Sequence, residues 1–291
     1  MIIDVHAHLG RAGRKRTDTL SAAQLIEKMD AWGIEKACVL PLHDCAEGWY
    51  LQSTTEDVLA ACAAHPGRLV PFCLIDPRFG DNSPQADFGD LLAEYRERGC
   101  RGIGEMLPNL YFDDPRALNL FRQAGQAGLP VLFDMMHRIG GTYGLVDDPG
   151  LPRLERALRE LPETLFIGHG PTFWAEISAG VPLDQRGGYP KGPIRRGGAV
   201  PRLMAAYPNL YADLSAGSGY NAVTRDPAFG LEFLDRFQDK LLFGTDVLRH
   251  DQTERDVPIV GFFRRLRNEG PLSEAAWRKI AADNAIRLLK L

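Results

Sequence analysis

Short apolar segments alternate with amphipathic helical segments along nearly the whole chain, and this alternation most limits the possible folds. Strands are expected at residues 2–8, 36–41, 69–75, 101–106, 130–134, 164–169, 209–214 and 241–246. Strands separated by helices form right-handed crossovers, and eight of them at near-regular spacing predict an α/β fold closed into a (β/α)8 TIM barrel. A doubly wound open sheet is the alternative. Because 291 residues fit one barrel, we expect a single domain over residues 1–291.

Capping residues and the spacing of apolar side chains place the helices between these strands. Ser21 can begin a helix that ends at Gly33. Further helices are expected near 53–65, 85–98, 115–127, 151–161, up to 207, and 228–238. Residues 170–200 are rich in glycine and proline, which predicts a loop with little regular structure that could act as a lid. Residues 273–291 predict C-terminal helices packed on the outside of the barrel.

Composition argues against several classes of protein. A hydrophobic content of 45% is enough for one large core, and a net charge of -4 argues against nucleic-acid binding, which needs clustered basic charge. No apolar stretch approaches roughly 18 residues and no signal-peptide pattern is present, so we expect a cytoplasmic protein that does not bind membranes. The cysteines have no Cys-x-x-Cys spacing, which predicts reduced thiols (Cys38, Cys45, Cys62, Cys73 and Cys100). Many apolar helix positions leave a homo-oligomer open.

Two histidines in the first expected strand indicate a metal site. Side chains alternate faces along a strand, so His6 and His8 share one face, and Asp4 is expected to share it too. We expect Asp4 to support the ligands or to belong to the barrel core, and not to ligate the metal itself. Polar side chains on one face of an apolar strand are costly without partners, and a divalent cation is a partner that suits imidazole. A His-x-His that merely caps a strand is the alternative. The pair lies at the C-terminal end of its strand, however, where parallel sheets bind ligands.

Acidic and imidazole side chains also stand at the ends of three later strands. Glu105 ends the fourth strand, His169 the sixth and Asp246 the eighth. Because strand C-termini converge on one mouth of a barrel, these side chains are expected beside His6 and His8. Their ligand types suit a divalent metal, zinc above all, with manganese as a second option.

Several segments resemble the amidohydrolase superfamily, and within it the amidohydrolase-related group of metal-dependent hydrolases and decarboxylases. The resemblance rests on Ile3-Asp4-Val5-His6-Ala7-His8, Gly168-His169-Gly170, Phe243-Gly244-Thr245-Asp246 and the C-terminal Asp283-Asn284-Ala285-Ile286-Arg287-Leu288-Leu289. It spans almost the whole chain. It implies that His6, His8 and His169 ligate the metal, and that Asp246 both ligates and shuttles a proton.

Two positions raise questions about the number of ligands and ions. Such relatives usually carry a histidine directly after the fifth strand, where this chain has Asp134, with His137 three residues later. Asp134 could ligate as a carboxylate, His137 could swing back, or the site could hold one ligand fewer. Glu105 is similar to the fourth-strand glutamate that bridges two metals in deoxyribonuclease-like relatives, so one or two ions are expected. A structural pair between Glu105 and Arg101 or another surface arginine is the alternative.

The expected chemistry follows from the metal. A Zn²⁺ ion lowers the pKa of a coordinated water toward about 7 and polarises a substrate carbonyl. Asp246 would accept the proton and pass it to the leaving group, while His169 would ligate or hydrogen-bond the developing oxyanion. Four residues in loops expected at the mouth could bind a small-molecule substrate, or could simply be solvated: Arg11, Tyr143, Arg249 and His250.

Three functions are compatible with these observations. The first is a metal-dependent hydrolase that acts on a small-molecule amide, lactone or ester. The second is a non-oxidative decarboxylase of a small aromatic or unsaturated carboxylic acid, because relatives with nearly the same ligands break carbon–carbon bonds. The third is a catalytically silent barrel that binds a ligand, which the departure at Asp134 motivates.

Overall fold

The computed structural model describes residues 1–11, 19–42 and 53–291, apart from the side chain of Arg11. Two predictions therefore fall outside the described residues: substrate binding by the Arg11 side chain and the reduced state of Cys45. The other four cysteines, Cys38, Cys62, Cys73 and Cys100, are buried free thiols, as predicted. Among the described residues, no helix has both the length and the apolar character needed to cross a lipid bilayer.

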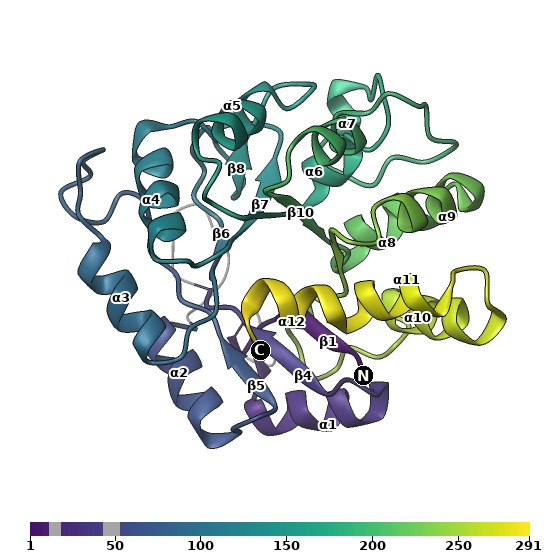
Figure 1. Ribbon diagram of the computed structural model, residues 1–291, viewed down its shortest axis with the longest axis horizontal. Helices are drawn as coiled ribbons and strands as arrows, with labels where there is room; N and C mark the ends of the chain where they lie inside the picture. The colour runs from purple at the N-terminus through teal and green to yellow at the C-terminus, as the bar shows by residue number, and fades with distance from the viewer. Residues whose placement is uncertain (12–18, 43–52) are drawn as a thin grey trace.

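Eight of the described strands surround the centre of the fold (Figure 1). They are β1 (Ile3–Ala7), β4 (Lys36–Val39), β5 (Leu69–Pro71), β6 (Ile103–Met106), β7 (Val131–Met136), β9 (Phe166–His169), β10 (Leu210–Asp213) and β11 (Leu241–Leu242). They pair in parallel as β1-β4-β5 and as β11-β10-β9-β7-β6. Parallel bridges between Cys73 and Ile103 and between Ala7 and Val247 join the two sheets on both sides. The ring of strands confirms the predicted (β/α)8 barrel.

Helices surround this ring and end close to their predicted limits. The longer ones are α1 (Ala22–Trp32), α2 (Thr55–Ala64), α3 (Gly89–Glu97), α4 (Pro115–Gln126), α5 (Pro152–Glu160), α7 (Ala199–Ala206), α8 (Ala216–Thr224), α9 (Pro227–Arg236) and α10 (Pro258–Glu269). Ser21 forms a capping box with Gln24, and Gly33 ends α1 in the left-handed conformation, as expected. The helix predicted from residue 85 begins only at Gly89. Of these longer helices, α8 and α10 were not predicted.

The remaining short strands lie outside the ring. β2 (Gly10–Arg11) pairs antiparallel with β3 (Thr19–Leu20), and β8 (Leu145–Val146) adds to the end of β7. β2 and β3 belong to the segment that follows β1, and β8 belongs to the segment that follows β7. These short strands therefore extend the barrel at the end where the ring strands terminate.

Residues 170–200 contain more regular structure than their glycine and proline content predicted. The helix α6 (Pro171–Ala175) follows β9 at once, because Pro171 suits the first turn of a helix, and the 3-10 helix η1 (Leu183–Gln185) follows it. Arg186, only 2% exposed, donates from Nε to Glu176 Oε1 at 2.7 Å and from Nη1 to the Asp147 carbonyl at 3.2 Å. These buried contacts fix the segment, and its role as a lid stays a prediction.

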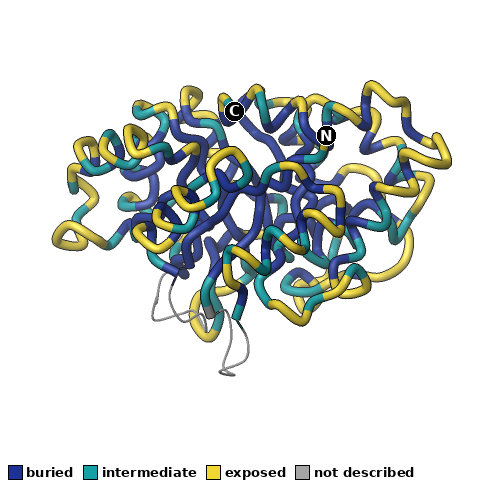
Figure 2. The backbone as a smooth tube through the Cα atoms, turned by 90° about the horizontal axis from the view of Figure 1, so that it is seen from below, coloured by how far each residue is buried: buried dark blue, intermediate teal, exposed yellow. Residues whose placement is uncertain are grey.

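The C-terminal helices close one end of the barrel instead of packing on its outside. After α11 (Glu274–Arg278) and the π-helix η2 (Lys279–Asp283), α12 (Asn284–Leu289) lies across the end of the strand ring (Figure 1). Its Leu288 and Leu289 join a buried cluster with Val5, Leu132 and Ile167 of the strands. Both termini lie at the same end of the molecule, and the buried strands run through its centre (Figure 2). The apolar side chains whose spacing suggested a helix on the outside of the barrel instead pack against the barrel interior.

Asn284 ties this closing helix to the eighth strand of the ring. Its side-chain amide donates to the carbonyls of Gln238 at 2.7 Å and Leu241 at 2.9 Å, and the residue is buried. Asn284→Ala leaves two carbonyls without this donor, so we expect the free energy of unfolding to fall by about 2 kcal/mol. Urea denaturation followed by circular dichroism measures the change. Asp283→Ala, at the exposed neighbouring position, should shift it by less than about 0.5 kcal/mol. Equal midpoints for both variants would contradict this role of Asn284.

Candidate metal centre

An irregularity in β1 aims two imidazoles at one point. β1 advances three residues from Asp4 to Ala7 where β4 advances two, from Ala37 to Val39. Such a bulge redirects side chains, and it brings the Nε2 atoms of His6 and His8 to 2.9 Å from each other.

The same bulge breaks the strict alternation between Asp4 and the histidines, and Asp4 is not among the grouped metal-ligand atoms of the described residues. The Asp4 carboxylate accepts hydrogen bonds from the backbone N–H of His6 at 3.0 Å and of Thr245 at 2.9 Å. It also accepts one from Thr245 Oγ1 at 2.5 Å. Asp4 therefore links β1 to the segment that follows β11.

Two carboxylates complete a set of four donor atoms around the imidazole pair. Glu105 Oε2 lies 3.5 Å from His6 Nε2 and 3.4 Å from His8 Nε2. Asp246 Oδ1 lies 3.7 Å and 3.3 Å from the same two nitrogens. Ligands of a tetrahedral zinc ion, about 2.0–2.1 Å from the metal, are separated by about 3.3 Å. The spacing and the donor types therefore fit one divalent ion.

Each histidine of the cluster is fixed through its other ring nitrogen. His8 Nδ1 lies 3.0 Å from the Leu40 carbonyl. Asp213 Oδ2 lies 2.7 Å from His6 Nδ1 and 3.1 Å from His169 Nδ1. Partners of this kind select the tautomer that leaves Nε2 free for a metal. Asp213 was missed from the sequence, although its place at the end of the seventh ring strand is a signal that could have found it.

A second group of donors lies on the other side of Glu105. His169 Nε2 is 3.7 Å from Glu105 Oε1 and 4.0 Å from Asp134 Oδ2. Asp134 is buried, and its Oδ1 atom has no hydrogen-bond partner among the described residues. A Cβ atom on Gly144 would lie 2.4 Å from Oδ1, and one on Gly170 would lie 2.7 Å from Oδ2. The glycines thus leave room for a carboxylate whose free oxygen a second ion could satisfy.

Electrostatics show that this cluster needs positive charge. Burial raises the pKa of the Asp134 carboxyl, and the charges of Glu105 and Asp246 raise it further. Burial disfavours the charged form of His8, but hydrogen bonds to Asp246 and Glu105 outweigh it and raise the pKa to about 9. Burial also opposes the charge on Glu105, yet the imidazoles, His6 above all, hold its pKa well below the usual range. Protons on the imidazoles therefore supply positive charge that a cation can replace.

Asp246 is the most accessible of the ligand carboxylates. Its side chain is 21% exposed, against 7% for Glu105. Its backbone has a left-handed φ of 57°, uncommon for a residue other than glycine, and its N–H donates to the His6 carbonyl at 2.7 Å. The side chain opens onto a cavity of about 60 Å³. The described residues lining this cavity are His8, Glu105, Asp134, Tyr143, His169, Pro171, Tyr189, Ala216, Ser218, Asp246 and Leu248.

The other predicted residues are distributed unevenly around this cavity. His137 lies outside the metal cluster, and a Cβ atom on Gly187 would lie 2.2 Å from its Nδ1. His137 therefore does not swing back to replace a ligand.

Of the predicted substrate-binding residues, Tyr143 lines the cavity. Arg249 pairs with Asp251 at 3.0 Å, and the exposed His250 lies 3.1 Å from the Thr19 carbonyl. Neither is among the described residues that line the cavity, whereas Tyr189 and Ser218, which the sequence did not single out, are.

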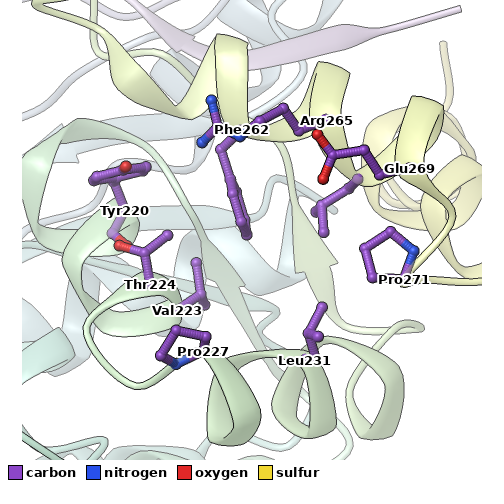
Figure 3. A pocket seen from close by; sticks show the side chains of 10 residues that line it. Tyr220, Val223, Thr224, Pro227, Leu231, Phe262, Arg265, Glu269 and Pro271 are labelled. Carbon is purple, nitrogen blue, oxygen red and sulfur yellow. The ribbon is translucent and has the colours of Figure 1, made fainter.

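A larger cavity of about 320 Å³ lies away from this cluster, between α8, α9 and α10 (Figure 3). Its lining is mostly apolar, with Tyr220, Leu231 and Phe262 among the side chains. Arg265 and Glu269 are its only charged lining residues among those described. The described lining of this larger cavity therefore contains no group of metal ligands, whereas the groups of metal-ligand side chains lie at the ends of the ring strands.

Comparisons with known proteins agree with the observed fold. The family model described as amidohydrolase matches residues 3–291, and no curated protein matches the chain. An amidohydrolase from Burkholderia multivorans, solved with bound zinc, has 15% sequence identity and a TM-score of 0.66, covering 100% of this chain and 99% of that one.

Two further solved structures carry the names of different reactions. A probable 2-pyrone-4,6-dicarboxylic acid hydrolase from Acinetobacter baumannii is 13% identical with a TM-score of 0.60. The 5-carboxyvanillate decarboxylase from Sphingomonas paucimobilis is 14% identical with a TM-score of 0.59. Each comparison covers 100% of this chain and 99% of the other, and at such identities each shows the fold alone. Since the family model spans nearly the whole sequence, the chain belongs to the amidohydrolase family.

Proposed function

We propose that the protein is a metal-dependent hydrolase that acts with water on a small-molecule amide, lactone or ester. The observation that carries this proposal is the set of four donor atoms from His6, His8, Glu105 and Asp246, spaced for one divalent ion beside a cavity. Zinc suits this mixture of nitrogen and oxygen donors, and manganese is the second candidate. Glu105 and Asp134 provide for a second ion.

Asp246 is the proposed proton carrier. A divalent ion at this centre polarises a carbonyl group and makes water more acidic. Asp246 directs Oδ1 toward the imidazoles of His6 and His8, which leaves Oδ2 available to accept a proton from water and return it to the leaving group. His169, held by Asp213, places Nε2 beside Glu105 and Asp134, where it can ligate the second ion or hydrogen-bond a developing oxyanion.

Charge at the cavity favours hydrolysis of a neutral compound over decarboxylation of an acid. Among the described lining residues, the carboxylates are Glu105, Asp134 and Asp246, and none is lysine or arginine. A substrate carboxylate would find no cationic side chain among them and would depend on the metal alone for positive charge, whereas a neutral amide, lactone or ester needs no such partner.

Decarboxylation remains the second candidate because solved structures with this fold include decarboxylases. The metal-loaded protein should hydrolyse para-nitrophenyl acetate, dihydrocoumarin or hydantoin and lose this activity on chelation. Carbon dioxide release from 2,6-dihydroxybenzoate without hydrolysis of that panel would favour decarboxylation. An absence of both reactions and of bound metal would favour a catalytically silent barrel.

Replacing Asp246 tests its role as proton carrier. Asp246→Asn keeps an oxygen that can face the metal but removes the base, so we expect kcat for the best ester or lactone to fall by about 10²–10⁴. Steady-state kinetics together with metal content measure this change. Asp251→Asn, at an exposed carboxylate nearby, is the matched control and should keep the activity. Full activity of Asp246→Asn would contradict the assignment.

Asp213 should affect the metal without touching it. Although burial raises the pKa of Asp213, hydrogen bonds with His169 and His6 hold that pKa well below the usual range, so it stays ionised. Asp213→Asn removes the carboxylate that orients both rings, and we expect zinc affinity to fall by about 10–100-fold. Competition with a chelator of known affinity measures the loss. An unchanged zinc affinity would show that the ring orientation does not depend on Asp213.

Metal binding should depend on pH because protons occupy the same imidazoles. Below its pKa of about 9, His8 of the metal-free protein carries a proton that an ion must displace. The zinc affinity should therefore rise with pH up to at least about pH 9, changing by about tenfold per pH unit for each proton released. Chelator competition, corrected for the titration of the chelator, measures the slope. An affinity independent of pH between about 7 and 9 would contradict protonated ligands in the metal-free state.

A further inference from the structure

Tyr189 forms part of the wall of the metal-site cavity, although it belongs to the segment between α6 and α7. It lines the cavity together with the ligands His8 and Asp246. A Cβ atom on Gly217, near the start of α8, would lie 2.8 Å from Cε2 and 3.1 Å from the hydroxyl oxygen of Tyr189. The absence of a side chain at Gly217 therefore makes room for the tyrosine ring.

The chain is anchored on both sides of Tyr189. Three residues earlier, the carbonyl of the buried Arg186 accepts a hydrogen bond from Thr172 Oγ1 at 3.1 Å. One residue later, the Pro190 carbonyl accepts one from Asn221 Nδ2 at 3.1 Å. A backbone held in this way loses little conformational entropy when its side chain contacts a ligand. Tyr189 is thus placed to bind without a large rearrangement.

The ring of Tyr189 is accessible to a ligand, and Tyr189 lines the same cavity as the proposed metal ligands. Tyr189 is 53% exposed, which is high for a large aromatic side chain. Partial burial raises the pKa of its hydroxyl, and the charges of Asp246 and Asp134 raise it further, which places the hydroxyl within the field of both carboxylates. The hydroxyl therefore remains a neutral donor at ordinary pH.

Other apolar groups line the same cavity. Tyr143 and Leu248 both pack against the buried pair Leu42 and Leu107, and both line the cavity together with Pro171 and Ala216. Two aromatic rings and small apolar groups near a polar centre suit a flat ligand with one polar end. A planar ring gains from offset or edge-to-face contact with tyrosine, beyond the area that it buries.

We propose that Tyr189 is a substrate-binding residue that selects compounds with a planar aromatic or unsaturated ring attached to the amide, lactone or ester group. This inference rests on the proposed function, because it names the substrate class for the same site. The ring of Tyr189 contacts the planar ring of the substrate, and the polar group of the substrate faces the ligands His8 and Asp246.

A pair of zinc-binding probes separates ring recognition from catalysis. Benzohydroxamate and acetohydroxamate share the group that binds zinc, and only the former carries a planar ring. With the zinc-loaded full chain, isothermal titration calorimetry should show tighter binding of benzohydroxamate. Tyr189→Ala should weaken benzohydroxamate by about tenfold and leave acetohydroxamate within about twofold. Tyr189→Phe, which keeps the ring, should retain the preference.

Tyr111→Ala provides the matched control. Tyr111 is 44% exposed and lies against the Arg153 guanidinium, 4.2 Å from ring centroid to Cζ, and it is not among the described residues that line the cavity. This variant should bind both probes like the parent protein. Zinc content measured for every variant excludes an indirect effect through the metal.

Two kinds of result would overturn the proposal. One is the absence of a ring preference in the parent protein, including no binding of either hydroxamate. The other is a Tyr189→Ala variant that retains the preference or weakens both probes equally. Because binding requires no turnover, a preserved ring preference with no hydrolysis of any ester, lactone or amide would reject the proposed hydrolase activity and leave ring recognition by Tyr189 intact.

Discussion

Repulsion between buried carboxylates is the constraint on which the rest of the structure depends. Glu105, Asp134 and Asp213 are buried at the same end of the barrel, and Asp246 stands beside them. Three carboxylates and their imidazole neighbours would be costly in a low-dielectric interior without compensating positive charge. Protons on the imidazoles or a bound cation can supply it. Only a rigid frame can hold such groups together, and the closed ring of strands provides that frame.

The contacts that close the ring are also those that assemble the metal ligands. Asp4 accepts hydrogen bonds from Thr245 and from the backbone of His6, and Asp246 donates its own N–H to the His6 carbonyl. The first and last ring strands are therefore joined through the residues that carry ligands or flank them. At the other end of the barrel, α12 covers the apolar interior. Fold stability and ligand geometry consequently share one set of interactions.

The sequence predicted the barrel and the gathering of His6, His8, Glu105, His169 and Asp246 because periodic patterns and strand ends are local properties. It did not predict features that depend on tertiary contacts. The bulge that breaks the alternation between Asp4 and the histidines arises in the pairing of β1 with β4. Asp213 contacts the imidazole rings of His6 and His169, which are distant in the chain. Tyr189 lines the cavity because Gly217 leaves space for its ring and Asn221 hydrogen-bonds the neighbouring backbone. Amphipathic spacing places α12 against apolar residues but cannot say which ones.

Anomalous scattering at the zinc edge from crystals of the zinc-loaded protein tests the central claim most directly. The account predicts a peak about 2.1 Å from the Nε2 atoms of His6 and His8, with Glu105 and Asp246 completing the coordination. A second peak between Glu105 and Asp134 would establish two ions. Zinc bound elsewhere, with these four side chains not coordinating it, would contradict the account.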